Sequence, residues 1–85
     1  MKVNPEELQE TANEFLQASK DIDEIMLKLS KSVKRVQDSW EDSSQQRFYL
    51  YYKEWNQHMG GVSEILHTIA DELDAIADRY ADADK

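Results

Sequence analysis

"DSWEDSSQQRF", residues 38–48, is the stretch of sequence that decides how this chain folds. It lies near the middle of 85 residues and separates two segments in which apolar side chains recur every three or four positions. Asp42, Ser43 and Ser44 are residue types that cap the start of a helix, which leaves only about residues 41–44 for a turn. Because so short a connection forces the flanking helices to be antiparallel neighbours, the sequence predicts an all-α helical hairpin with one domain, residues 1–85.

The first helix is predicted over about residues 5–40. Asn4 is a good N-cap and Pro5 suits the first helical position. The steps between apolar positions alternate between four and three, which is the 3.5-residue period of helices that pack along a continuous line. The stripe consists of Leu8, Ala12, Phe15, Ser19, Ile22, Met26, Leu29, Val33, Val36 and Trp40. Trp40, next to the turn, is expected to cover the apolar end of the hairpin while its indole N–H reaches a polar group of the loop.

The second helix is predicted over about residues 44–80, with the same spacing. Its stripe consists of Phe48, Tyr52, Trp55, Met59, Val62, Leu66, Ile69, Leu73, Ile76 and Tyr80. The stripe keeps its phase across Gly60 and Gly61, so we expect a continuous helix there despite the low helix propensity of glycine. Residues 81–85 are expected to be a flexible acidic tail, because carboxylates near a helix C-terminus oppose the macrodipole.

One line of contact leaves much of each helix exposed, so a second surface is expected to be buried in a dimer. A seven-residue repeat of small or apolar residues beside the first stripe is the predicted interface: Thr11, Ala18, Ile25, Ser32 and Ser39. Residues 28–56 carry six Lys or Arg and four Asp or Glu, a net charge of +2, whereas the rest of the chain carries four and fourteen, a net charge of −10. Because opposite charges attract and like charges repel, an antiparallel four-helix bundle is predicted.

The composition excludes several classes of function. A net charge of −8 argues against binding nucleic acid or anionic membranes, and no apolar run is long enough to cross a bilayer. The chain has no cysteine, no glycine-rich phosphate loop and no catalytic triad pattern. His58 and His67 fall on different helical faces, and His67 with Asp71 alone makes a poor metal site. We therefore expect no enzyme, no metal, no cofactor and no membrane insertion.

The aromatic segment "FYLYYKEW", residues 48–55, places more apolar surface near the turn than one helix contact can cover. Contact within a dimer and docking of a second protein both explain it.

A tryptophan in the turn of a cysteine-free hairpin, followed by Tyr80 and Asp84 as a C-terminal Tyr-x-x-x-acid pair, resembles the WXG100 (ESAT-6-like) family. The resemblance implies small helical hairpins that form antiparallel four-helix dimers and leave bacteria folded, through type VII secretion systems. It implies that Trp40 stands for the family's tryptophan, and that Tyr80 and Asp84 form the export signal read by the membrane-bound motor ATPase. The turn motif here reads Trp40-Glu41-Asp42, with an aspartate at the position of the family's glycine.

The expected function is therefore that of a non-enzymatic protein secreted as a folded dimer, with a cytoplasmic pool before export. The alternative is a cytosolic targeting chaperone that pairs with the helical N-terminal domain of a larger type VII toxin. A structural coiled-coil adaptor unrelated to secretion is a third hypothesis. The partner in the dimer is a second copy or a homologue, and the sequence does not distinguish between them.

Overall fold

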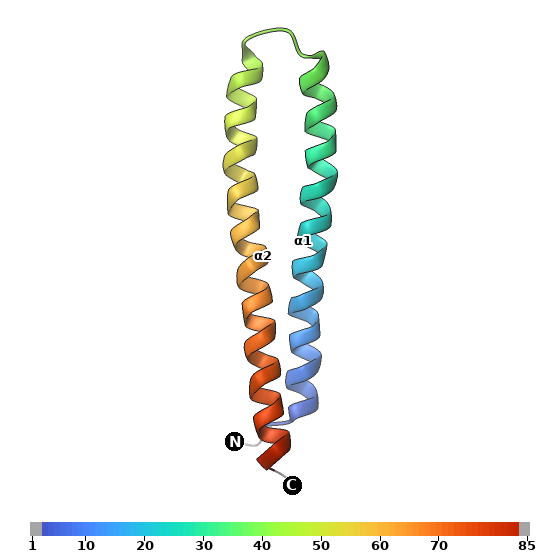
Figure 1. Cartoon of the computed structure of the whole chain (residues 1–85), viewed down its shortest axis with the longest axis vertical. Helices are drawn as coiled ribbons and strands as arrows, with labels where there is room; N and C mark the ends of the chain where they lie inside the picture. The colour runs from blue at the N-terminus through green and yellow to red at the C-terminus, as the bar shows by residue number, and fades with distance from the viewer. Residues whose placement is uncertain (1–2, 84–85) are drawn as a thin grey trace.

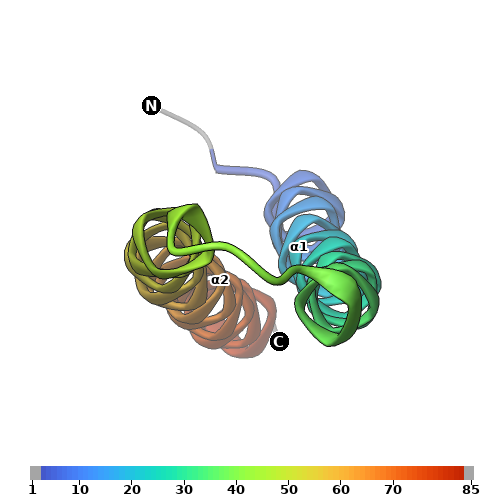
Figure 2. The same ribbon diagram turned by 90° about the horizontal axis from the view of Figure 1, so that it is seen from above.

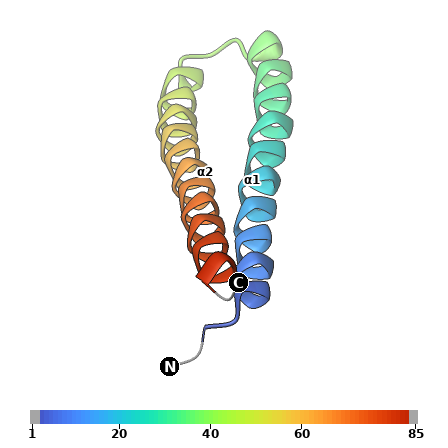
Figure 3. The same cartoon turned by 60° about the horizontal axis from the view of Figure 1, so that its bottom comes forward.

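The computed structural model describes residues 3–83, which form two long antiparallel helices, α1 (Pro5–Ser39) and α2 (Ser44–Ala83). They lie side by side, and the turn that joins them is at one end of the molecule (Figure 1). The start of α1 and the end of α2 lie together at the other end (Figure 3). The hairpin is a rod of 66 × 16 × 15 Å with a radius of gyration of 19.2 Å. A compact chain of this length would have a radius of about 12 Å. The predicted all-α hairpin is confirmed.

The start of α1 follows the expected capping chemistry. The Asn4 side-chain oxygen accepts a hydrogen bond from the Glu6 amide at 2.9 Å, and Pro5 occupies the first turn. The helix ends at Ser39, because Trp40 has extended backbone angles, φ −93° and ψ 115°. The α-helical backbone conformation of α1 therefore ends at the residue before Trp40.

The end of α2 differs from the sequence-based expectation. The helix continues to Ala83, so residues 81–83 are not the flexible tail that was predicted to begin after Tyr80. Ala81 and Ala83 have the highest helix propensity of any residue, and the opposing effect of exposed acidic side chains on the macrodipole is below about 1 kcal/mol. Propensity therefore outweighs the charge effect here.

We call the line of contact between α1 and α2 the seam. Its buried side chains are small. The buried residues of the seam recur at seven-residue spacing and are Ala12, Ser19 and Val33 on α1 and Ser63, Ala70 and Ala77 on α2. Seen from above the turn, the two helices lie side by side (Figure 2). No large side chain in residues 3–83 is fully buried. Small residues let two helix backbones approach closely, but they bury little apolar area.

The stripe predicted on α1 contains its buried residues, but the stripe predicted on α2 is displaced by one position from the seam. Val62 is exposed, and Ile69 and Ile76 are only half-buried, whereas the following residues, Ser63, Ala70 and Ala77, are buried. The prediction followed the large apolar residues, whereas contact with α1 is made by the small ones.

The glycine pair lies inside a continuous α2, as expected. Neither glycine has a positive φ. A Cβ on Gly60 would lie 3.8 Å from Met26 Cε across the seam, whereas a Cβ on Gly61 would have no neighbour within 4 Å. The helix therefore needs neither glycine for its backbone conformation.

Candidate functional site: the turn and the apolar face

The turn is organised by the carboxylate of Asp42. Its Oδ1 accepts hydrogen bonds from Trp40 Nε1 at 3.1 Å, from the Ser44 amide at 2.9 Å and from the Ser44 hydroxyl. Trp40 Nε1 also lies 3.2 Å from Ser44 Oγ. Asp42 therefore caps α2 and anchors the indole at once, and the expectation that the Trp40 N–H reaches a polar loop group is confirmed.

These donors also set the charge state of Asp42. The hydrogen bond from the Ser44 hydroxyl, then those from the Ser44 amide and the Trp40 indole, lower the pKa of Asp42 from its ordinary value of 3.8. Each donor favours the ionised carboxylate. Glu41, the middle residue of the predicted turn motif, is exposed.

The Trp40 ring is half-buried and packs on the first turn of α2. Its centroid lies 5.3 Å from that of Phe48, with the ring planes at 36°. Further along α2, Tyr52 contacts both Tyr49 and Trp55, with centroid distances of 6.5 and 6.1 Å. Contacts within the chain therefore cover part of the aromatic surface next to the turn, although Tyr51 remains 67% exposed.

Large apolar side chains lie three positions beyond the seam residues on both helices. Because α1 and α2 run in opposite directions, these two rows fall on the same side of the hairpin. We call this side the apolar face. Its rows are Leu8, Phe15, Ile22, Leu29 and Val36 on α1, and Tyr52, Met59, Leu66, Leu73 and Tyr80 on α2. None of these ten side chains is buried in the single hairpin.

A shallow apolar hollow confirms that the two rows border one surface. It has a volume of about 190 Å³ and is lined by Phe15 and Ala18 of α1, Leu66 of α2 and Glu14 at the edge. The predicted interface residues lie beside the α1 row: Ile25 and Ser39 are exposed, and Thr11, Ala18 and Ser32 are half-buried. The sequence-based set thus lies at the margin of the apolar face, and the large side chains at its centre were assigned to the contact between the helices.

The opposite side of the hairpin has a depression lined by polar and acidic side chains. A wider depression of about 340 Å³ is lined there by Glu6, Gln9, Glu10 and Asn13 of α1 and Asp74 of α2. We call this side the polar face. Near the start of α1, the two sides of the hairpin therefore differ, one lined by apolar and the other by hydrophilic side chains.

The accessible surface of the molecule is large for its mass. It amounts to 6929 Å², whereas a compact monomer of 10.0 kDa exposes about 5,200 Å². The excess, about 1,700 Å² on one chain, is about twice the 800 Å² that each partner buries in a standard protein–protein interface.

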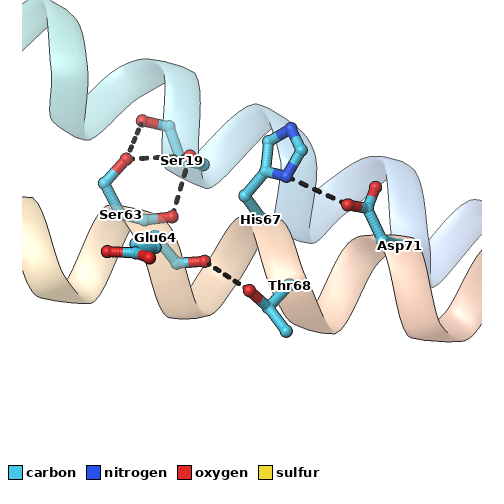
Figure 4. A network of polar contacts seen from close by, with 6 residues as sticks. All are labelled: Ser19, Ser63, Glu64, His67, Thr68 and Asp71. Carbon is cyan, nitrogen blue, oxygen red and sulfur yellow. Dashed lines mark hydrogen bonds and ion pairs between the residues drawn. The ribbon is translucent and has the colours of Figure 1, made fainter.

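A polar network in the middle of the seam was not predicted. The hydroxyls of Ser19 and Ser63 lie 2.8 Å apart, and each also lies within hydrogen-bonding distance of the other residue's carbonyl oxygen, at 3.0 and 3.3 Å (Figure 4). Ser63 Oγ further donates to Asp23 Oδ1 at 2.7 Å. The two serines are only 4% and 6% exposed. The one available signal was Ser19, a polar residue inside an otherwise apolar stripe.

The histidines make local pairs on the surface. His67 Nδ1 lies 3.2 Å from an Asp71 carboxylate oxygen (Figure 4), and His58 lies 3.9 Å from Glu54. Among residues 3–83, no group of three or more His, Asp or Glu side chains is arranged to hold a metal ion. Over the same range, neither helix combines the length and apolar character that crossing a membrane requires.

The two predicted halves of the family signature lie far apart in one chain. Trp40 is at the turn, whereas Tyr80 is in the last turns of α2 at the other end of the 66 Å rod and is 45% exposed. Asp84, the second residue of the predicted export signal, lies outside the described residues. A single hairpin therefore does not bring Trp40 and Tyr80 together.

Comparison with known proteins gives a consistent result. Residues 1–85 match the family described as "WXG100: Proteins of 100 residues with WXG". The fold is similar to that of the secreted protein EsxB from Bacillus anthracis, with a TM-score of 0.92 and 26% identity, covering 100% of this chain and 97% of that one. A point mutant of that protein has a TM-score of 0.91 at the same identity, covering 100% and 94%. An uncharacterized protein from Clostridium acetobutylicum is 24% identical over 84 residues, which is 99% of this chain and 88% of that protein.

Proposed function

Because this chain belongs to the WXG100 family, we propose that it is a small non-enzymatic protein that a bacterial type VII secretion system exports as a folded dimer. It is made in the cytoplasm, pairs there and leaves the cell through the secretion system. Support comes from the match of the whole chain to the family and from the similarity of the fold to a secreted protein.

The observation that carries this proposal is the placement of the large apolar side chains. The seam buries alanine, serine and valine, while rows of leucine, isoleucine, phenylalanine and tyrosine lie on the apolar face. A monomer in water gains nothing from such a surface, but a dimer buries it. The two depressions lined by described residues are both open to solvent, which suits a binding role better than catalysis.

The export signal of this proposal is Tyr80 with Asp84, read by the motor ATPase of the secretion system. Tyr80 is the last member of the α2 row of the apolar face and is 45% exposed in the single hairpin, so the motor ATPase of this proposal reads the part of the side chain that the dimer leaves uncovered. In an antiparallel dimer the Tyr80 of one chain lies at the level of the Trp40 of the other, because the two residues are at opposite ends of each hairpin. The signal is then composite, with one part from each chain.

The experiment that tests the signal compares variants of Tyr80 in the native host. Tyr80→Ala is expected to abolish export while the protein accumulates in the cell as a folded dimer. Tyr51→Ala serves as the matched control, because Tyr51 is also exposed but lies near the turn. The amounts in culture supernatant and cell lysate are measured by immunoblot, and the dimer is checked by sedimentation. Wild-type export of Tyr80→Ala would show that the signal lies elsewhere.

The chaperone alternative predicts that a different protein binds the apolar face. If the chain remains in the cell and pairs with the N-terminal domain of a larger toxin, affinity purification from the native host recovers that protein in a 1:1 ratio. If it is the secreted dimer, the same purification recovers a second copy or a homologue of similar size.

A further inference from the structure

We propose that the side of α2 that points away from α1 is a docking site for one helix of a different protein, an amphipathic helix with lysine or arginine beside its apolar row. Gly61 is at the centre of this site, with Tyr51 and Ile65 on either side of it along α2. The inference goes beyond the proposed function and is independent of the export signal.

The outer face of a helix is defined here as the positions two before and two after those that the seam residues occupy in the heptad repeat. Each residue turns an α-helix by about 100°, so a side chain two positions from the seam points away from the other helix. On α2 the outer face runs from Arg47 to Arg79, and all of its residues are exposed. The ion pair between Glu72 and Arg79, 3.8 Å apart, lies along it.

The outer face of α1 is the internal reference, because it has the same geometry. From Glu7 to Asp38 it carries nine charged side chains and one glutamine, and all ten are exposed. This is the composition expected of a helix surface that only water contacts. The outer face of α2 differs, since Tyr51, Gly61 and Ile65 lie on it.

The apolar side chains of this region are the most exposed that the structure describes. Leu50, which borders the outer face beside Tyr51, is 67% exposed, as is Tyr51 itself, and Ile65 is 61% exposed. The apolar face lies about 100° or more around α2 from them. A dimer formed over the apolar face therefore leaves all three side chains in water.

Gly61 has no role in the packing of its own chain. Its φ is not positive, and a Cβ at this position would have no neighbour within 4 Å. Glycine has the lowest helix propensity of any residue except proline. What glycine offers at an exposed helical position is the close approach of another backbone. The neighbour that approaches must come from outside this chain.

The spacing of the apolar groups fits a helix as the occupant. Tyr51 and Ile65 are about 21 Å apart along α2, and Gly61 is about 6 Å from Ile65. A helix of about four turns spans this distance, with one large apolar side chain over Gly61 and others against Tyr51 and Ile65. An extended peptide would need the unpaired backbone edge of a sheet, which a helix does not offer.

Charge determines the chemistry of that helix. Glu54, Glu64 and Glu72 lie on or beside the outer face and are exposed. Glu54 has only a neighbouring histidine as a local partner, at 3.9 Å. Because the chain also carries a net charge of −8, a second copy is repelled from this surface, whereas a helix with lysine or arginine beside its apolar row is attracted.

Photo-cross-linking in the native host tests the site. A benzophenone amino acid is placed at Gln57, one turn before Gly61, and in a matched protein at Gln17 on the outer face of α1. The proposal predicts an adduct from position 57 with a different protein, at least fivefold more abundant than any adduct from position 17. Mass spectrometry should place the cross-link in a segment with apolar residues every three or four positions and lysine or arginine beside them.

Three results would overturn the proposal. An adduct from position 57 with a second copy of this chain would show self-association through the outer face. A yield no higher than that from position 17 would show that only water covers it. A cross-linked segment without the apolar repeat or the basic residues would show that the occupant is of another kind.

Alanine at each glycine separates docking from folding. Gly61→Ala and Gly60→Ala both raise helix propensity, so each is expected to raise the melting temperature by about 4–8 °C. Only Gly61→Ala adds a methyl group to the outer face, since a Cβ on Gly60 faces Met26 across the seam. The adduct from position 57 should fall at least fivefold in Gly61→Ala and stay within twofold of wild type in Gly60→Ala. Equal yields from the two variants would overturn the proposal.

Discussion

The seam and the apolar face divide the hydrophobic residues of this hairpin unequally. The seam is buried but contains small residues, among them Ala12, Ala70 and Ala77, whereas the apolar face carries the large side chains and leaves them partly in water. Transfer free energy scales with apolar area, at about 25 cal/mol per Å². Most of the hydrophobic stabilisation available to this sequence is therefore gained when the face is covered. The seam holds two helices together in a defined alignment, and the face supplies the stability.

The largest expected effect comes from the apolar face. Phe15 lines the hollow and is half-buried in one hairpin, and the proposed dimer covers it. Phe15→Ala is expected to lower the free energy of unfolding of the dimer by about 3 kcal/mol per chain. Urea unfolding at two protein concentrations measures this effect, and the unfolding midpoints of both proteins should fall on dilution because less dimer forms. A loss below about 1 kcal/mol that is independent of concentration would place the stabilising contacts in the seam instead.

A smaller effect is expected from the polar network inside the seam. Ser63→Ala removes the hydroxyl that contacts Ser19 and donates to Asp23, so the buried Ser19 hydroxyl and the Asp23 carboxylate each lose a hydrogen-bond partner. The expected loss is about 1–2 kcal/mol, with the dimer dissociation constant unchanged within about threefold. Thr68→Ala is the control, because that hydroxyl bonds only its own helix, at the Glu64 carbonyl. If Ser63→Ala dissociates the dimer, the seam and the face are not independent.

The smallest effect belongs to the turn, which lies outside both surfaces. The pKa of Asp42 is lowered from 3.8, so its carboxylate stabilises the folded form at pH values above that and stops doing so as the pH falls through the lowered pKa. Asp42→Asn keeps a capping side chain without the charge. The stability difference between wild type and Asp42→Asn is expected to shrink as the pH is lowered from about 5 to about 3. Chemical unfolding across that range measures it, and a difference that grows on acidification contradicts the assignment.

Asp42 also explains how this chain forms its turn without the glycine in the family's name. Trp40 and Asp42 both have a negative φ, since no residue of the described chain, glycine included, has a positive φ. The aspartate compensates with its carboxylate, which accepts hydrogen bonds from the indole N–H and from the Ser44 amide, the first of α2.

The sequence was sufficient for the fold because its signals are local. The capping residues at 42–44 and the two periodic stripes determine the number of helices, their approximate bounds and their antiparallel arrangement. Hydrophobic periodicity could not distinguish which side of the α2 stripe faces α1, because large apolar residues mark any buried surface, within a chain or between chains. Ser63, Ala70 and Ala77 also repeat every seven residues, but small residues carry little weight in a hydrophobic pattern.

The candidate sites were predictable only where neighbours in sequence are neighbours in space. The link between Trp40 and its turn was expected, since the residues involved are within four positions of one another. The Ser19–Ser63 contact spans 44 residues and depends on the alignment of the helices, which the sequence leaves open by a few positions. The hollow beside Ala18 requires Leu66 from the other helix and could not be found from either segment alone.

The central claim is that the apolar face of this hairpin is covered by a second copy. Sedimentation equilibrium of the purified protein at micromolar concentration tests it most directly. The account predicts a single species of twice the 10.0 kDa chain mass, helical by circular dichroism. A species of the single-chain mass with the same helical spectrum and cooperative unfolding would contradict it.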